Sequence, residues 1–258
     1  MADARRGRPP EPEPQWRRFE RFLSELSSPD WVFRGHSDTS WKLRPKIGRE
    51  DLVSKWTASA EVALLAEFKR RARQFETGVD FSDWDWLALA QHFGLPTRML
   101  DWTQNPLVAA YFAVSSRPLN TDAEVVAVLA RERDYLDLND EGARNPRPFD
   151  SDTWPSQFDA QGGVAFVRPL IRAPRMISQR GVFSVHLNPT EDWEGFRRRL
   201  LGQPRYRIIK PRRFKIPAAF RLHFQNRIGS LGVDASSIMS DLGGICEALT
   251  WRYMNPSL

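Results

Sequence analysis

The chain has 258 residues, of which 41% are hydrophobic and 27% charged, a composition typical of a globular protein that buries a sizeable core. It contains no apolar run of 18 or more residues and has one cysteine, Cys246, which together exclude a membrane-spanning helix, an intramolecular disulfide and a cysteine-based zinc site. These features favour a cytoplasmic protein that has no membrane partner.

Apolar spacing predicts helices over residues 16–26 and 58–75, with a short strand at 31–33 between them. Residues 41–45 alternate in an extended pattern. Residues 1–14 are basic and then rich in Pro and Glu, so they predict a disordered tail rather than a secretory signal.

The next stretch, QHFGLPTRMLDWTQN at residues 91–105, packs many polar side chains between two helices. Ser82 and Asp85 form a capping-box pattern that starts the first helix, and Gly94 is placed as its left-handed stop. Asn105 followed by Pro106 starts the second helix, which is apolar to residue 115 and therefore buried. His92 is then expected at a helix end, with the residues after it in the connection.

Further strands are expected at 124–130, 163–167, 181–187 and 206–209, and helices at 190–201, 217–231 and 235–253. Residues 131–160 are polar and are expected to form a long loop. Because strands and helices mix without regular alternation, residues 15–258 predict a single α+β domain. Its central sheet is expected to be mostly antiparallel and flanked by helices.

The net charge of +6 is distributed unevenly along the chain. Residues 165–227 carry 15 Lys and Arg against 3 Asp and Glu, whereas residues 1–164 carry 22 against 26. A basic region of this kind favours a phosphate-rich partner such as nucleic acid. The alternative is a genome that favours arginine, because the chain has 32 Arg and 6 Lys.

Two groups of residues are candidates for a functional site. Arg34 follows a strand and can offer a two-pronged donor to a phosphate, while Gly35 lets a ligand approach the backbone. The alternative, which the spacing alone favours, is an Arg held in a structural salt bridge beside a turn Gly. His92 can act as a general base that Asp101 orients, although a C-capping histidine and a turn-capping aspartate explain them equally well. We predict that Arg34 and the 91–105 stretch share one pocket.

Several kinds of site are excluded by the motifs that the sequence lacks. There is no HExxH pair and no carboxylate cluster at metal spacing, so no metal site is expected. The phosphate loop GxxxxGK[ST], the dinucleotide fingerprint GxGxxG and the hydrolase elbow GxSxG are also missing.

The chain resembles the FRG domain family, which is named for Phe-Arg-Gly, here residues 33–35. The resemblance continues at Trp41, at the Leu-x-Pro of residues 43–45, at Arg49, and through residues 91–113. A third block lies at residues 175–183, followed by Lys210 and Ile216-Pro217. The family occurs in bacterial and phage genomes, sometimes in toxin or defence settings.

At the level of fold, the start of the chain also resembles ADP-ribosyltransferases, in which an Arg or His at the end of the first strand anchors NAD. This resemblance implies an NAD-using transferase or glycohydrolase, with catalytic roles for Arg34, His92 and Asp101. The chain departs from those enzymes in lacking a Glu near residues 179–181. The remaining substrate contacts would come from Gly35, Gln91, Thr97, Arg98, Thr103, Asn105 and Gln179. The alternatives are a non-catalytic module that binds a nucleotide or nucleic acid, and a metal-independent nuclease.

Overall fold

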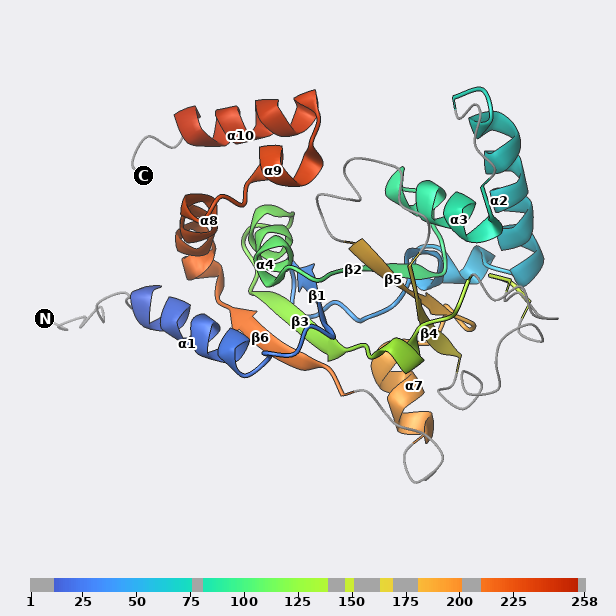
Figure 1. The fold of residues 1–258 in the computed structure, drawn as a ribbon, viewed down its shortest axis with the longest axis horizontal. Helices are drawn as coiled ribbons and strands as arrows, with labels where there is room; N and C mark the ends of the chain where they lie inside the picture. Colours follow the sequence, from blue (N-terminus) through green and yellow to red (C-terminus); the bar gives the residue numbers. More distant parts are fainter. Residues whose placement is uncertain are drawn as a thin grey trace, which may run out of the picture.

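A computed structural model describes residues 12–75, 81–138, 147–150, 163–168, 181–200 and 210–254. These residues form an α+β fold around one six-stranded sheet, which confirms the predicted fold class (Figure 1). The strand order is β4-β5-β2-β1-β3-β6, and every named pair of strands is antiparallel.

The strands are β1 Trp31–His36, β2 Met99–Thr103, β3 Ala123–Leu129, β4 Val164–Val167, β5 Gly181–His186 and β6 Arg212–Ile216. The helices are α1 Pro12–Ser24, α2 Ala58–Ala72, α3 Asp83–His92, α4 Pro106–Ser115, α7 Trp193–Leu200, α8 Arg221–Ser230, α9 Ala235–Met239 and α10 Leu242–Met254. Short 3-10 turns occupy Lys46–Gly48, Val53–Lys55, Glu132–Asp134 and Ala218–Phe220.

The sheet consists of two three-stranded halves that meet between β2 and β1. Strand β1 pairs with β3 at six positions and β2 pairs with β5 at five, whereas β1 and β2 share the single register pair Phe33–Thr103. We call the boundary between β1 and β2 the seam. Beyond that pair the two strands diverge, so the seam can admit side chains.

A separate group of helices packs on each half of the sheet, and both groups lie on the same face of the sheet. One apolar cluster packs α1, α4 and α8 on the half that contains β1, β3 and β6, and a second packs α2 and α3 on the half that contains β4, β5 and β2. Figure 1 shows α2 and α3 at the right of the molecule and α1 and α8 at the left, with α4 between the two groups. A third cluster, which includes Leu43, Trp193 and Phe196, covers the opposite face of the sheet.

The predicted helix boundaries around the central stretch are confirmed. Ser82 and Asp85 form a complete capping box at the start of α3, and Gly94 follows the helix with a φ of 86°. The Asn105 side chain accepts a hydrogen bond from the Leu107 N–H at the start of α4. The local sequence therefore fixes where both helices begin and end.

Other predicted boundaries are wrong. Residues 99–103 form strand β2 rather than a connection. Helix α1 begins at Pro12, inside the expected tail. Helix α7 begins at Trp193 rather than at residue 190, and the Gly195 N–H in its first turn donates to Asp192. The expected strand at 206–209 and most of the loop at 131–160 lie outside the described residues.

Gly35 lies directly against helix α4. A Cβ at Gly35 would lie 2.1 Å from the Ala109 carbonyl oxygen and 2.6 Å from the Ala113 nitrogen. Both are backbone atoms, which cannot move aside without shifting the helix. The close approach of α4 therefore requires glycine at this position, whereas the expectation that Gly35 lets a ligand approach stays a prediction.

We expect the variant Gly35→Ala to lose about 3 kcal/mol of unfolding free energy, because an added methyl group overpacks the contact between β1 and α4. Urea denaturation measures this loss. The matched control is Gly229→Ala on α8, where a Cβ would meet no atom within 4 Å. The control should be neutral or stabilising, and equal stability of the two variants would contradict the prediction.

No helix among the described residues is long and apolar enough to cross a membrane.

Candidate functional site

A pocket of about 340 Å³ opens along the seam, between the two helical groups. We call it the seam pocket. It lies at the end of α3 and beside α4, where the diverging strands leave backbone and side-chain atoms uncovered. Its lining comprises Phe33, Arg34, Gly35, Ser37, Trp41, Arg49, Gln91, His92, Asp101, Trp102, Thr103, Val108, Ala109, Phe112 and Ser116. The prediction that Arg34 and the 91–105 stretch share a pocket is therefore confirmed.

Arg34 bridges the seam. Its Nη1 donates to the Asp101 carbonyl oxygen at 2.7 Å and lies 3.6 Å from the Asp101 carboxylate. The guanidinium thus adds a side-chain hydrogen bond between β1 and β2, which share a single register pair. The Arg34 side chain is 15% exposed, so part of the guanidinium faces the pocket.

The Asp101 carboxylate is the most exposed charged group of this contact, at 56%. Gln91 Nε2 donates to it at 2.9 Å, and the Thr97 hydroxyl donates to the side-chain oxygen of Gln91, Oε1, at 2.5 Å. Thr97 is buried and does not line the pocket, so its predicted contact with a substrate is replaced by a role in orienting Gln91. This chain of bonds fixes Asp101 from the α3 side while Arg34 fixes it from the β1 side.

The other polar residues of the 91–105 stretch divide between the pocket and the backbone. His92 ends α3 and lines the pocket, with its ring 5.1 Å from the ring of Phe93. Thr103 also lines the pocket, and its hydroxyl accepts from the Asn105 N–H at 3.0 Å. Asn105 does not line the pocket, and its side chain caps α4; its predicted contact with a substrate stays a prediction.

Arg98 is a structural residue rather than a substrate contact. It is 3% exposed and forms a two-pronged ion pair with Glu61 of α2, with Nε–Oε1 at 3.0 Å and Nη2–Oε2 at 2.7 Å. The Trp56 indole donates to the same carboxylate at 3.0 Å, and the Arg98 guanidinium lies 4.8 Å from the centre of the Phe149 ring. The ion pair ties α2 to the start of β2.

His186 lies close to this ion pair at the end of β5. Its Nε2 is 3.2 Å from the Ser184 hydroxyl, which in turn accepts from the Trp102 indole at 2.9 Å. Burial, followed by the positive charges of Arg98 and Arg34, lowers the pKa of His186 to about 3. The imidazole is therefore neutral in the folded protein throughout the physiological range.

This pKa predicts a loss of stability in acid. The unfolded chain binds a proton at His186 below about pH 6.5, but the folded chain does so only near pH 3. Above pH 6.5 the imidazole is neutral in both states, and the unfolding free energy is at its full value. Between pH 6.5 and pH 4 the unfolded chain gains a proton that the folded chain does not, so about 3 kcal/mol of the unfolding free energy should be lost. We expect His186→Gln to remove this component, so that urea unfolding at several pH values shows a flatter profile than the wild type. Parallel profiles would contradict the prediction.

The electrostatics of the seam pocket combine two cations with one anion. Burial lowers the pKa of Arg34; Asp101 opposes this change, and Arg49 adds to it through repulsion. Burial also lowers the pKa of Arg49, against the attraction of Asp51 and Asp101. Both guanidinium groups remain charged, because an arginine in a protein stays protonated. An anionic ligand would therefore relieve the repulsion between Arg34 and Arg49.

Sequence reasoning did not assign Arg49, Trp41 or Phe112 to the site, although all three line the pocket. Trp41 and Arg49 belong to the FRG pattern that the sequence resembles, so this pattern was the signal that could have identified them. Gln179, which was predicted to contact the substrate, lies outside the described residues.

The described part of the basic region is mostly neutralised within the chain. Within 4.0 Å of a carboxylate lie Arg168, Arg197, Arg199, Arg212, Arg213, Lys215 and Arg227. Arg221 is buried and donates to main-chain carbonyls, including those of Val114 and Ser116. A nucleic-acid partner for residues 165–227 stays a prediction. Among the described residues no group of His, Cys, Asp or Glu could hold a metal ion.

Residues 29–122 match the family model of the FRG domain. The resemblance expected from the sequence is therefore confirmed over this span, which contains every described lining residue of the seam pocket. The third expected block, at residues 175–183, lies beyond the matched span. No curated protein and no solved structure matches the chain.

Proposed function

From the FRG-domain match and the lining of the seam pocket, we propose that the protein is an ADP-ribosyltransferase-like enzyme that uses NAD. It transfers ADP-ribose to an acceptor, or hydrolyses NAD when the acceptor is water. The observation that carries the proposal is the pair of guanidinium groups, Arg34 and Arg49, on the pocket wall beside one carboxylate, Asp101.

The pocket suits a nucleotide in size and chemistry. Ligand pockets commonly enclose about 300–1,000 Å³, and the seam pocket lies at the low end of that range. A pocket of this volume would hold one nucleotide of NAD, and the other nucleotide would lie on the surface beside it. Arg34 and Arg49 provide planar donors for a pyrophosphate, and the rings of Trp41 and Phe112 provide surfaces on which a base or nicotinamide can stack.

The reaction breaks the C–N bond between nicotinamide and ribose, and nicotinamide leaves with the bonding electron pair. The Asp101 carboxylate stabilises the positive charge that develops on the ribose. A hydroxyl, an amine or water then attacks the same carbon, and His92 takes the proton that the attacking group loses. Asp101 takes the place of the catalytic Glu of the enzymes that the chain resembles, because it is the carboxylate among the described lining residues.

The test is incubation of the purified protein with labelled NAD, with and without DNA or RNA, followed by mass spectrometry of every component. Release of nicotinamide supports the proposal, and the mass that an acceptor gains identifies the target. Intact NAD with intact nucleic acid would overturn the proposal in favour of a non-catalytic binding module. Intact NAD with cleaved nucleic acid would overturn it in favour of a nuclease.

A further inference from the structure

A chain of hydrogen bonds leads from Arg34 along one face of the sheet to the edge strand β6. The Arg34 Nε–H donates to His36 Nε2 at 3.2 Å, and His36 Nδ1 lies 3.1 Å from Glu124 Oε1. Glu124 in turn forms an ion pair with Arg213 of β6. His36 and Glu124 are direct neighbours across the β1–β3 ladder, so the strand pairing itself brings them together.

The donors and acceptors of this chain fix the tautomer of His36. The Nε of an arginine always carries a hydrogen, so His36 Nε2 can take part only as an unprotonated acceptor. The proton of the neutral ring must then reside on Nδ1, from which it is donated to Glu124. Any change that moves this proton to Nε2 would place two donors against each other.

The His36–Glu124 pair is shielded from water. The His36 side chain is 3% exposed and that of Glu124 is 6%. Burial lowers the pKa of His36; Glu124 opposes this change, and the charges of Arg34 and Arg213 add to it. A further neighbour is Trp41, an uncharged ring whose centre lies 6.1 Å from that of His36. When His36 is neutral, each donor in the series Arg34–His36–Glu124 therefore meets an acceptor.

We propose that His36 and Glu124 are positioning residues that hold the guanidinium of Arg34 in its orientation toward the seam pocket. The inference rests on the proposed function in one respect, namely that the guanidinium so held binds the pyrophosphate of NAD. A two-pronged contact with phosphate requires a fixed guanidinium plane. Asp101 fixes one edge of that plane at Nη1, and His36 fixes the other at Nε.

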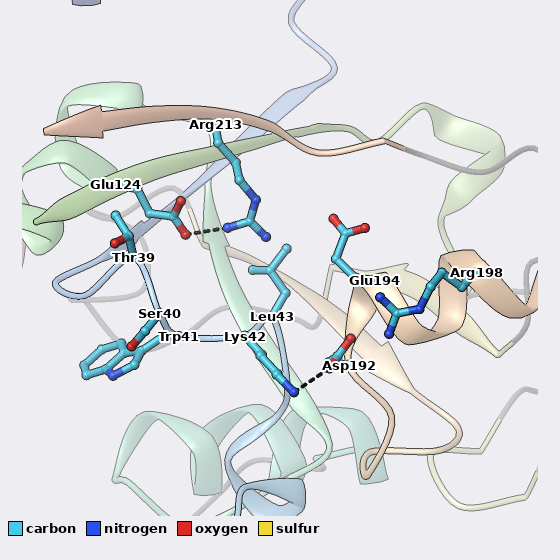
Figure 2. A pocket seen from close by; sticks show the side chains of 10 residues that line it. All are labelled: Thr39, Ser40, Trp41, Lys42, Leu43, Glu124, Asp192, Glu194, Arg198 and Arg213. Atoms are coloured by element: carbon cyan, nitrogen blue, oxygen red, sulfur yellow. Dashed lines mark hydrogen bonds and ion pairs between the residues drawn. The ribbon is translucent and has the colours of Figure 1, made fainter.

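Arg213, at the far end of this series of hydrogen bonds, can be replaced without changing a residue that lines the seam pocket. Arg213 and Glu124 line a second pocket of about 380 Å³, whose other residues include Lys42, Asp192 and Arg198. Figure 2 shows the Arg213 guanidinium beside the Glu124 carboxylate at the wall of this pocket, with the ion pair drawn between them. Arg213 is 32% exposed, so its replacement leaves the buried core in place.

The first experiment needs no ligand. Nitrogen-15 NMR of the full chain at pH 7.5 should show the His36 ring with Nδ1 protonated and Nε2 unprotonated, together with a slowly exchanging Arg34 Nε–H. In Glu124→Gln the exchange of that Nε–H should quicken on the order of tenfold, because a neutral amide, which can also present its NH2 to the ring, replaces the carboxylate that fixes the His36 tautomer. A wild-type His36 protonated at Nε2, or an unchanged Arg34 signal in the variant, would overturn the proposal.

The second experiment measures NAD affinity by calorimetry between pH 5 and pH 8. Glu124→Gln should weaken NAD binding on the order of tenfold at pH 7.5. Arg213→Gln removes a charge that lowers the pKa of His36, so its affinity should begin to fall at a higher pH than that of the wild type. If the pH dependence of NAD affinity in Arg213→Gln is the same as in the wild type, His36 and Glu124 contribute to stability alone and the proposal is overturned. If the wild type binds no NAD, the proposed function fails, while the NMR result still decides whether the pair positions Arg34.

Discussion

The variant Glu61→Gln is expected to lose about 3–5 kcal/mol of unfolding free energy, because it leaves the Arg98 guanidinium buried without its counter-charge. The Arg98 and Glu61 side chains are 4% and 2% exposed, so water cannot replace the lost carboxylate. Since small domains are stable by only about 5–15 kcal/mol, this loss should shift the urea midpoint far below that of the wild type.

A double variant separates the ion pair from the packing around it. Replacing both partners, as in Glu61→Leu with Arg98→Met, removes both charges and should recover much of the loss. The matched control is Glu67→Gln on the same helix, where an exposed carboxylate pairs with Arg70 and Arg71, and it should change stability little. A small loss in Glu61→Gln, comparable to that of the control, would show that the ion pair contributes little to stability.

The buried Arg98 shows what sequence reasoning could not determine. Its predicted role as a substrate contact came from its position in a polar stretch, which is the same evidence that correctly placed Gln91, His92 and Asp101 beside the pocket. Its partner, Glu61, lies 37 residues earlier on α2, and the local sequence carries no signal for that pairing. Contacts between distant segments decide which polar residues face a ligand and which neutralise each other.

Local signals, in contrast, were sufficient for the boundaries of the two helices around the site. The capping box at Ser82 and the Asn-Pro start at residue 105 act through hydrogen bonds within three residues, so the sequence alone specifies them. Strand β2 was missed because its five residues lie between these helices and alternate too briefly to reveal a period. The divergence of β1 from β2, on which the seam pocket depends, has no local signature.

The variant Arg34→Ala is expected to weaken NAD binding at least about 100-fold, because it removes a two-pronged, charge-assisted contact with the pyrophosphate. Arg34→Lys should recover part of the affinity, since it keeps the charge but loses the planar fork that Asp101 and His36 hold. Isothermal calorimetry with NAD measures both effects. Arg70→Ala, which changes an exposed arginine on α2, is the matched control and should bind NAD as the wild type does.

Because Arg34 also ties β1 to β2, lost binding alone could reflect a disturbed seam, and Asp101→Asn distinguishes the two explanations. This variant keeps the main-chain carbonyl that accepts from Arg34 and removes only the carboxylate. In the proposed reaction Arg34 binds the ground state and Asp101 stabilises the transition state, so Asp101→Asn should lower kcat strongly and change KM little. Arg34→Ala should chiefly raise KM. If both variants change kcat and KM equally and both lower the Tm, the Arg34–Asp101 contact has a structural role only. The seam pocket would then bind its ligand through other groups.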